Sequence, residues 1–196
     1  ITKKEDIQQL VKETQKVFGS VDILINNAGG PPSGSFEDFS DEDWENAFQL
    51  NLLSYIRAVR EVLPDLKENG GKIINIASSS IKQPISGLIL SNTFRLGIVG
   101  LSKTLAEELG PYNILVNTVA PGRIATDRIA ELDEITAKKQ NVSMKEITRK
   151  AQNAIPLGRY GTPEEFAKFV VFLVSDVNTY VTGSALMIDG GSVKSI

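Results

Sequence analysis

The sequence predicts one α/β domain in which helices cover both faces of a parallel sheet. The chain has 196 residues, of which 41% are hydrophobic and 23% charged, so it can bury one sizeable core. Several short segments are apolar on both faces, which is typical of buried parallel strands. Amphipathic helical patterns lie between these segments, and this alternation indicates the α/β class.

Four segments have the pattern of buried strands, and each ends in small or polar residues. They are VDILINNAG (21 to 29), KIINIASSS (72 to 80), ILVNTVAPG (114 to 122) and SALMIDGG (184 to 191). Ligands bind α/β sheets beyond the carboxyl ends of the strands, so we expect these polar ends to gather around one crevice. Glycine and asparagine also serve ordinary turns, which is the alternative for any single strand end.

The helices between the strands have readable starts and apolar stripes. Three pairs resemble capping boxes: Thr2 with Glu5, Ser40 with Asp43, and Thr162 with Glu165. The first helix is expected to bury Ile7, Leu10, Val11, Val17 and Phe18. The second is expected to bury Ala47, Phe48, Tyr55, Ile56, Val59 and Leu63.

Residues 91 to 103, SNTFRLGIVGLSK, predict a further helix with a buried face of Phe94, Ile98, Leu101 and Leu105. Polar residues cluster at its start: Ser91, Asn92 and Arg95. Such a cluster is either a helix cap with a solvated charge or part of a functional site. This stretch alone leaves both interpretations open.

Composition excludes several classes of function. The 21 Lys and Arg residues against 24 Asp and Glu give a net charge of −3 without a basic run, which argues against nucleic-acid binding. Without cysteine or histidine the chain can form no disulfide and no zinc site of the usual kind, and we expect no metal. No apolar run reaches membrane-spanning length. We therefore expect a cytoplasmic protein that binds small molecules or other proteins.

Ordered segments along nearly the whole chain resemble the short-chain dehydrogenase/reductase family, nearest to its 3-oxoacyl-carrier-protein reductase branch. These segments are NNAG (26 to 29), FQLNLL (48 to 53), INIAS (74 to 78), GLSKTLAEELG (100 to 110), NILVNTVAPG (113 to 122), PLGRYGTPEEFAKFVVFL (156 to 173) and YVTGSALMIDGG (180 to 191). The resemblance implies a Rossmann-type doubly wound sheet that binds NAD or NADP. It also implies hydride transfer to or from the carbon of a carbonyl or alcohol.

The resemblance assigns two segments to cofactor binding. Asn26, Asn27, Ala28 and Gly29 would support the sheet and the adenosine site. Pro121, Gly122 and Thr126, as PGxxxT, would lie beside the nicotinamide. A glycine there would let the backbone approach the ring, and a threonine hydroxyl with backbone amides can hold a carboxamide.

The resemblance also locates the catalytic positions, two of which are changed. Asn51 and Ser78 match the residues that anchor a relay water and bind the reacting oxygen. The family's Tyr-x-x-x-Lys falls on Ser91 and Arg95, so the helix at 91 to 103 is the catalytic one. A serine alcohol is a far weaker acid than a phenol. Arg95 cannot shuttle a proton, but its fork could hold ribose hydroxyls or stabilise an alkoxide.

The family's glycine-rich diphosphate loop has no counterpart here. Strands and a loop amounting to about 60 residues, by the size of βαβ units, are expected to precede Ile1. Without them, the strand at 21 to 27 would be an exposed apolar edge. We therefore interpret the chain as an N-terminally incomplete sequence.

Residues 123 to 155 form the one long insertion, and we expect either a helical lid over the substrate or a solvated surface helix. The apolar faces at 46 to 66 and 92 to 109, together with what the resemblance implies, predict a homo-tetramer or homo-dimer. Two functions follow. The first is a nicotinamide-dependent oxidoreductase acting on a small carbonyl or alcohol. The second is a catalytically impaired dinucleotide-binding or interaction protein on the same scaffold.

Overall fold

Four parallel strands form a single sheet in the computed structural model, which describes residues 1–195. Their order in space follows their order in the chain: β1 (Ile23–Asn26), β2 (Gly71–Ile76), β3 (Ile114–Pro121) and β4 (Ala185–Ile188). Ile25 pairs with Ile74, Ile74 with Asn117, and Val119 with Leu186. All carboxyl ends therefore meet at one edge, as the sequence predicts.

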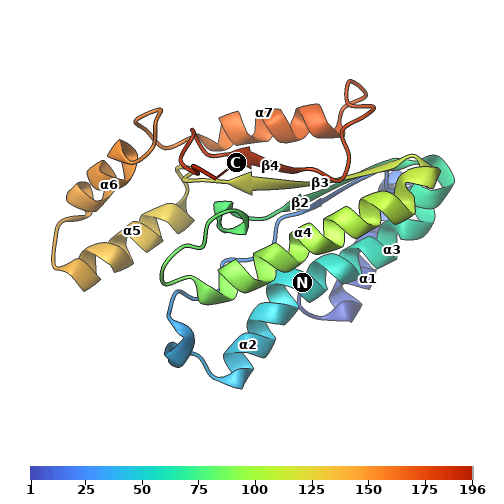
Figure 1. Ribbon diagram of the computed structural model, residues 1–196. Coiled ribbons are helices and arrows are strands. Elements are labelled where there is room, and N and C mark those ends of the chain that lie inside the picture. Colours follow the sequence, from blue (N-terminus) through green and yellow to red (C-terminus); the bar gives the residue numbers. More distant parts are fainter. Residues whose placement is uncertain (196) are drawn as a thin grey trace.

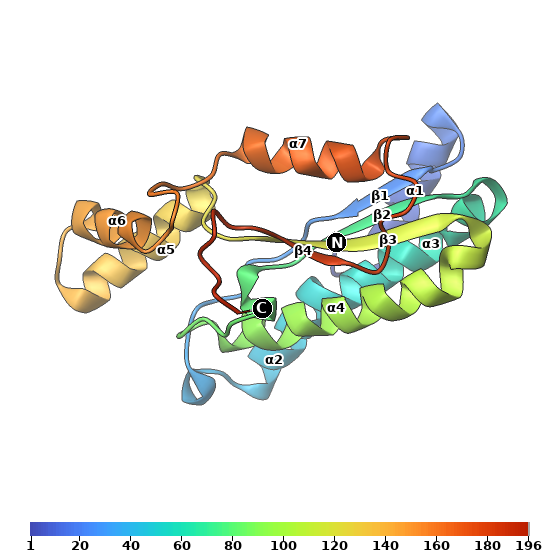
Figure 2. The same ribbon diagram turned by 45° about the horizontal axis from the view of Figure 1, so that its top comes forward.

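Helices cover both faces of this sheet (Figures 1 and 2). On one face lie α3 and α4, with α1 against α3, and on the other face lies α7. The helices are α1 (Lys4–Phe18), α2 (Asp41–Phe48), α3 (Ser54–Asn69), α4 (Ile89–Leu109), α5 (Asp127–Gln140), α6 (Met144–Asn153) and α7 (Pro163–Val174). The predicted α/β architecture with two covered faces is confirmed.

The core consists of two apolar layers because successive strand residues point to opposite faces. Ile73 of β2 packs with Val62 and Leu66 of α3, whereas its neighbour Ile74 packs with Val170 and Leu173 of α7. All six are at most 8% exposed. This two-sided burial explains why the strand segments read as continuous apolar runs.

Two of the three expected capping boxes form. Ser40 and Asp43 bond reciprocally at the start of α2, and Thr162 and Glu165 do so at the start of α7. The expected box at Thr2 is wrong, because α1 is capped by Lys3, which makes no side-chain hydrogen bond. A Ser or Thr followed three residues later by an acidic residue therefore forms a capping box only where the Ser or Thr is the N-cap residue of the helix.

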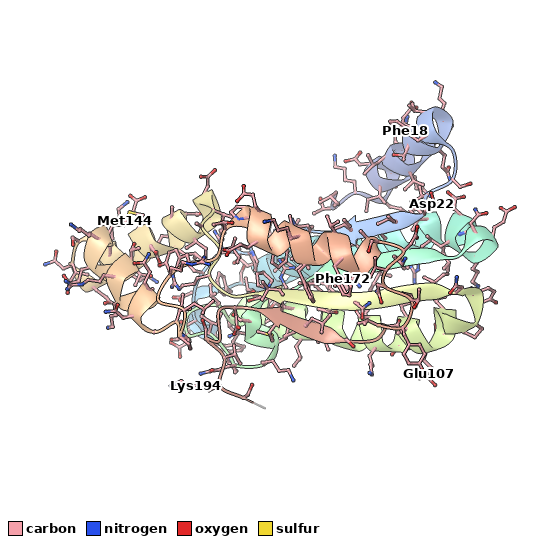
Figure 3. All side chains as sticks on the ribbon, turned by 90° about the horizontal axis from the view of Figure 1, so that it is seen from above. Phe18, Asp22, Glu107, Met144, Phe172 and Lys194 are labelled. Carbon is pink, nitrogen blue, oxygen red and sulfur yellow. The ribbon has the colours of Figure 1, made fainter. Side chains whose placement is uncertain are left out.

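The expected burial of the first helix is wrong in part. In α1, Ile7 is buried, but Leu10, Val17 and Phe18 are 63%, 66% and 83% exposed. Figure 3 shows Phe18 on the part of α1 that stands away from the sheet. In β1, an edge strand of this sheet, Ile23 and Ile25 are 43% and 48% exposed, which agrees with the exposed apolar edge expected for it. Periodicity identified these elements, but it does not say whether a partner covers them.

Candidate active site

The carboxyl ends of β1, β2 and β3 enclose a cavity of about 620 Å³, here called the strand-end cavity. Its walls come from the predicted strand-end segments and from α5 and α7. They include Asn27, Ala28, Gly29, Gly30, Ile76, Ala77, Arg95, Pro121, Gly122, Thr126, Arg128 and Ile129. The expected crevice therefore exists, and two cations and no carboxylate line it.

Gly29 follows the first strand, and its backbone lies against two buried polar side chains, those of Arg95 and Asn51. Its φ is +129°, a conformation that residues with a side chain rarely adopt. A Cβ at this position would lie 2.1 Å from Arg95 Nη2 and 2.4 Å from Asn51 Oδ1. Glycine is required here because the backbone lies against these two side chains.

Asn26 and Asn27 have different environments. Asn26 is 5% exposed, and its Nδ2 donates to Asn75 Oδ1 at 2.8 Å, which ties β1 to β2. Asn75 in turn donates to Ser102 of α4 at 2.9 Å. Asn27 is exposed and lines the strand-end cavity. The first asparagine therefore supports the sheet, and the second faces the cavity.

Arg95 is buried, at 8% exposure, and its guanidinium points to the strand ends. Nη1 donates to Ile76 O at 2.6 Å and to Tyr55 Oη at 3.0 Å, and Nη2 donates to Ala28 O at 2.9 Å. No salt bridge forms at Arg95 within residues 1–195. Arg95 is therefore not a solvated helix charge. Whether it also holds ribose hydroxyls stays a prediction, because three donors are engaged by the protein.

Tyr55 of α3 completes this arrangement, here called the Arg95–Tyr55 brace. Its hydroxyl accepts from Ala28 N at 3.1 Å and lies 3.0 Å from Ala28 O and 2.9 Å from Ile76 O. A phenol has one proton and can serve only one of these carbonyls at a time, whereas Arg95 reaches both. Burial raises the pKa of Tyr55 above its usual value, although the charge of Arg95 opposes this. The phenol therefore stays protonated.

Asn51 lies in a one-turn π-helix, Gln49–Leu53, between α2 and α3. Its side chain is fully buried, and Nδ2 donates to Ala47 O at 2.9 Å. Oδ1 has no hydrogen-bond partner within residues 1–195. A buried acceptor without a partner is costly, but Asn51 does not line the strand-end cavity, so the relay water expected at this oxygen stays a prediction.

Ser78 and Ser91 lie in different places. Ser78 ends the β2 segment, and its hydroxyl accepts from Ser80 N at 3.2 Å. It lines a second cavity of about 540 Å³, here called the lid cavity, which shares Gly122 and Ile129 with the strand-end cavity. Ser91 is buried at the start of α4 and lines neither cavity. Position 91 therefore offers no hydroxyl to either cavity wall.

The PGxxxT segment lies where the two cavities meet. Pro121, Gly122 and Thr126 all line the strand-end cavity. The structure gives Gly122 a further reason to lack a side chain, because a Cβ would lie 2.7 Å from the Cβ of Asp189 after β4. Thr126 is exposed, and its hydroxyl donates to Ile124 O at 3.3 Å. Its proposed contact with a carboxamide stays a prediction.

Residues 123 to 155 form α5 and α6, which lie beyond the carboxyl ends of the strands (Figure 1). Together with residues 78 to 88 they enclose the lid cavity. Its apolar lining consists of Ile85, Leu88, Ile129, Leu132, Ile147, Ala151, Ala154 and Ile155. Its charged lining is Arg123 and Lys150, and no acidic residue lines it.

Sequence reasoning missed a buried ionic cluster between Arg123, after the PG turn, and the helices α5 and α6, here called the Arg123 cluster. Asp133 of α5 is 1% exposed and accepts from Arg123 Nη1 at 2.5 Å and from Tyr160 Oη at 2.7 Å. Thr148 of α6 donates to the same carboxylate at 3.4 Å. Burial and the hydrogen bond to Asp133 raise the pKa of Tyr160. The one signal in the sequence that could have indicated this cluster is Arg123 itself, a charged residue directly after Pro121 and Gly122.

Two further properties concern the described residues. Among residues 1–195, no helix has the length and apolarity needed to cross a membrane. In the same part of the chain, no three His, Cys, Asp or Glu side chains are grouped so that they could hold a metal ion.

Comparison with known proteins identifies the family. Residues 1–193 match the family model described as Enoyl-(Acyl carrier protein) reductase. The 3-oxoacyl-[acyl-carrier-protein] reductase FabG of Aquifex aeolicus is 37% identical over 189 residues, which are 96% of this chain and 72% of that protein. The chain is a short-chain dehydrogenase/reductase. The family consists of NAD(P)-dependent oxidoreductases, so the predicted family, FabG-like branch and enzyme class are confirmed.

Other members of the family support the same assignment. The NADPH-dependent reductase BacG of Bacillus subtilis is 35% identical over 95% of this chain and 73% of its own length. The L-sorbose reductase of Gluconobacter frateurii, solved with NADPH and L-sorbose, has a TM-score of 0.93 at 32% identity and covers 100% of this chain. This chain covers 75% of that reductase. The Rossmann-type fold is therefore confirmed, and the chain spans about three quarters of these relatives.

Proposed function

We propose that this protein transfers hydride between NAD or NADP and a carbonyl or alcohol carbon. The observation that carries the proposal is the junction of the two cavities at Gly122 and Ile129, with Ser78 in the wall of the lid cavity. A substrate carbon that reacts at this junction would face a cofactor in the strand-end cavity. The rest of the substrate would lie in the lid cavity. Pockets of this volume suit small ligands.

The strand-end cavity fits the nicotinamide and ribose half of the cofactor. It is lined by backbone at Gly29, Gly30 and Gly122, where a flat ring can approach closely, and by the side chain of Thr126. Arg95 and Arg128 place positive charge in its wall, and Glu131, which pairs with Arg128, does not line it. When bound, the cofactor supplies or accepts the hydride. Asn26, Asn27, Ala28 and Gly29 are proposed to support the sheet and the adenosine half of the cofactor.

The catalytic residues differ from the family pattern in how they handle the proton. We propose that Ser78 hydrogen-bonds the reacting oxygen and that Asn51 Oδ1 holds a water for proton relay. Arg95 stabilises negative charge on that oxygen from behind the strand ends. Ser91 takes the place of the family's tyrosine. None of the four tyrosines lines either cavity, so no phenol donates the proton.

Turnover by the full-length protein tests this proposal. We expect slow loss of NADH or NADPH absorbance with some member of a panel of ketones, quinones and 3-oxoacyl thioesters. Ser78→Ala should reduce the rate by about 10²-fold or more, because the hydrogen bond to the reacting oxygen is lost in the transition state. Ser20→Ala, at an exposed residue before β1 that lines neither cavity, is the matched control. Absence of turnover with every substrate and both cofactors would contradict the proposal.

The Arg95–Tyr55 brace favours a second candidate, a dinucleotide-binding protein without catalytic activity. Its basis is the engagement of three Arg95 donors by protein acceptors and the burial of Ser91. Tight binding of NADPH, seen by fluorescence, without turnover of any substrate would support it. A rate gain in the Ser91→Tyr, Arg95→Lys double variant would show that only the missing phenol and ammonium limit catalysis.

Three finer properties belong to this proposal. We propose a cytoplasmic enzyme, since the chain has no cysteine. We propose that α5 and α6 act as the substrate lid, since they line the lid cavity with Ser78. A homo-dimer or homo-tetramer would bury the exposed apolar side chains Phe48 (36%) and Leu96 (56%) of α2 and α4. Light scattering of the full-length protein at micromolar concentration should show an oligomer, and a monomer would contradict this.

A further inference from the structure

We propose that the substrate of this enzyme is a carboxylic acid, an oxo acid or the matching hydroxy acid, and that Arg123 binds its carboxylate. This inference rests on the proposed function and names the substrate class of the same site. In the reduction, hydride from NAD(P)H bonds to the carbonyl carbon and a proton bonds to the oxygen. The C=O group becomes CH–OH, NAD(P)H is oxidised, and the carboxylate is unchanged.

The charge of the lid cavity is the first argument. The whole chain carries a net charge of −3, yet the lid cavity is lined by Arg123 and Lys150 and by no acid. A neighbouring cavity of about 370 Å³, lined by α5 and the residue 85 to 88 loop, adds Lys139 and again no acid. Asp133 behind the wall offsets the charge of Arg123, so Lys150 and Lys139 leave a positive excess on this surface, which attracts an anion.

The hydrogen bonds of Arg123 are the second argument. Its Nη1 donates to Asp133 and, at 3.2 Å, to Tyr160, which uses both hydrogens of that nitrogen. Nε and Nη2 make no hydrogen bond within residues 1–195. The Nε–Nη2 edge of a guanidinium presents two parallel N–H groups, the arrangement that binds a carboxylate through both oxygens. Arg123 is therefore anchored on one edge and available on the other.

The anchoring residues are the third argument. Asp133 is buried and belongs to α5, and Tyr160 precedes α7, so two elements hold the guanidinium. The centre of the Arg123 guanidinium lies 5.6 Å from the centroid of the Tyr160 ring. A guanidinium held in this way loses little conformational freedom when it binds an anion. Asp133 and Tyr160 are positioning residues, which act on the substrate through Arg123.

The position of Arg123 relates the carboxylate to the reacting carbon. Arg123 directly follows Gly122, the residue shared by the two cavities, and it lines the lid cavity together with Ser78. A carboxylate on Arg123 and a carbonyl near Ser78 would therefore both lie inside one cavity of about 540 Å³. The apolar side chains of α5 and α6 fit a hydrocarbon portion. A neutral ester or thioester lacks the group that Arg123 selects.

Binding of octanoate and of its uncharged analogue octanamide tests this directly. Calorimetry on the full-length protein with saturating NADP⁺ should show octanoate binding about tenfold more tightly or better, as expected for hydrogen bonds between charged groups. Arg123→Gln should abolish the preference. The matched control is Lys145→Gln, an exposed residue of α6 outside the cavity lining, which should leave the preference unchanged. Equal affinity for the two probes, or binding of neither, would overturn the inference.

A second variant covers the possibility that Arg123→Gln unfolds by leaving Asp133 buried without its cation. The double variant Arg123→Gln, Asp133→Asn replaces the ion pair by neutral groups that can still hydrogen-bond, and it should also lose the preference for octanoate. Retention of the preference in the folded double variant would overturn the inference. So would weaker NADP⁺ binding with unchanged octanoate binding, because Arg123 would then hold the cofactor.

Kinetics separate this inference from the proposed function. With 2-oxooctanoate and its methyl ester as substrates, we expect a lower KM for the acid, and Arg123→Gln should raise that KM more than it changes the KM for the ester. Turnover of the ester with equal or lower KM would leave the oxidoreductase function intact and overturn the carboxylate assignment. Octanoate preference without turnover of any carbonyl would uphold the carboxylate site and contradict the proposed function.

Discussion

Two arginines at the site, Arg95 and Arg123, have contrasting surroundings. Arg95 is buried behind the strand ends and bonds only neutral oxygens, those of Ala28, Ile76 and Tyr55. The Arg123 side chain is 37% exposed beside the lid cavity and is paired with the carboxylate of Asp133. Arg95 uses three of its five N–H donors on protein oxygens, whereas Arg123 uses two and keeps its Nε–Nη2 edge available.

This contrast shows why the same side chain supports structure in one place and recognition in the other. A buried guanidinium needs protein acceptors for its N–H groups, because burying a charged group without hydrogen-bond partners costs on the order of several kcal/mol. Neutral carbonyls do this for Arg95 and at the same time draw β1 and β2 together. Near the surface the requirement is weaker, so one anchoring carboxylate suffices for Arg123.

The largest expected effect comes from removing the buried guanidinium. Arg95→Ala should lower the free energy of unfolding by about 2–4 kcal/mol, because it leaves a cavity and removes three hydrogen bonds. Urea unfolding measures this. Arg149→Ala on α6, an exposed position, is the matched control and should change stability little. If Arg95→Ala weakened NADPH binding without loss of stability, Arg95 would be a cofactor ligand and not a brace.

A smaller effect is expected when only the phenol oxygen of the brace is removed. Tyr55→Phe leaves the buried N–H of Ala28 without its acceptor, which should lower the free energy of unfolding by about 1–3 kcal/mol. Tyr180→Phe, at a residue 96% exposed, is the control. Combined with Arg95→Ala, the two losses should be less than additive, because both residues share the same carbonyls. Full additivity would show that they do not act together.

Loosening the Arg123 cluster should affect stability less. Asp133→Asn keeps hydrogen-bonding capacity but removes the charge that anchors Arg123, and the cost should be about 1–2 kcal/mol because the arginine can still reach water. Hydrogen exchange should increase in α5 and α6 and stay unchanged in β2 and β3. Faster exchange throughout the sheet would mean that this cluster supports the core.

The smallest effect concerns an exposed ion pair next to the cluster. The hydrogen bond from Arg159, with that from the Thr162 backbone, lowers the pKa of Glu165 from 4.5 to about 2. Since the folded pKa is depressed, this stabilisation is present above about pH 4.5 and is lost as the pH falls towards about 2. Glu165→Gln should flatten the dependence of Tm on pH in this window relative to Glu42→Gln. An unchanged profile would mean that the ion pair contributes nothing.

The catalytic helix shows how far sequence reasoning reached at the site. Helical spacing and the family motif placed Ser91 and Arg95 on one helix, and the structure confirms that helix as α4. Neither pattern showed that the guanidinium points to Ala28 and Ile76, since these carbonyls lie 67 and 19 residues away in the chain. Tyr55 was predicted as part of an apolar stripe, and its hydroxyl turned out to be the centre of four hydrogen-bond contacts.

Sequence alone determined the α/β class, the four strands, two of the three capping boxes and the family. These depend on local patterning and on ordered motifs, which the linear chain records directly. Only the tertiary structure decided that α1 keeps its apolar side chains exposed, that Ser91 faces neither cavity, and that Arg123 meets Asp133 and Tyr160. Those outcomes depend on which segments, distant from one another in the sequence, come into contact in the folded protein. A hydrogen bond or a buried face exists only when a partner from a distant segment arrives within a few ångströms, and no local pattern specifies that arrival.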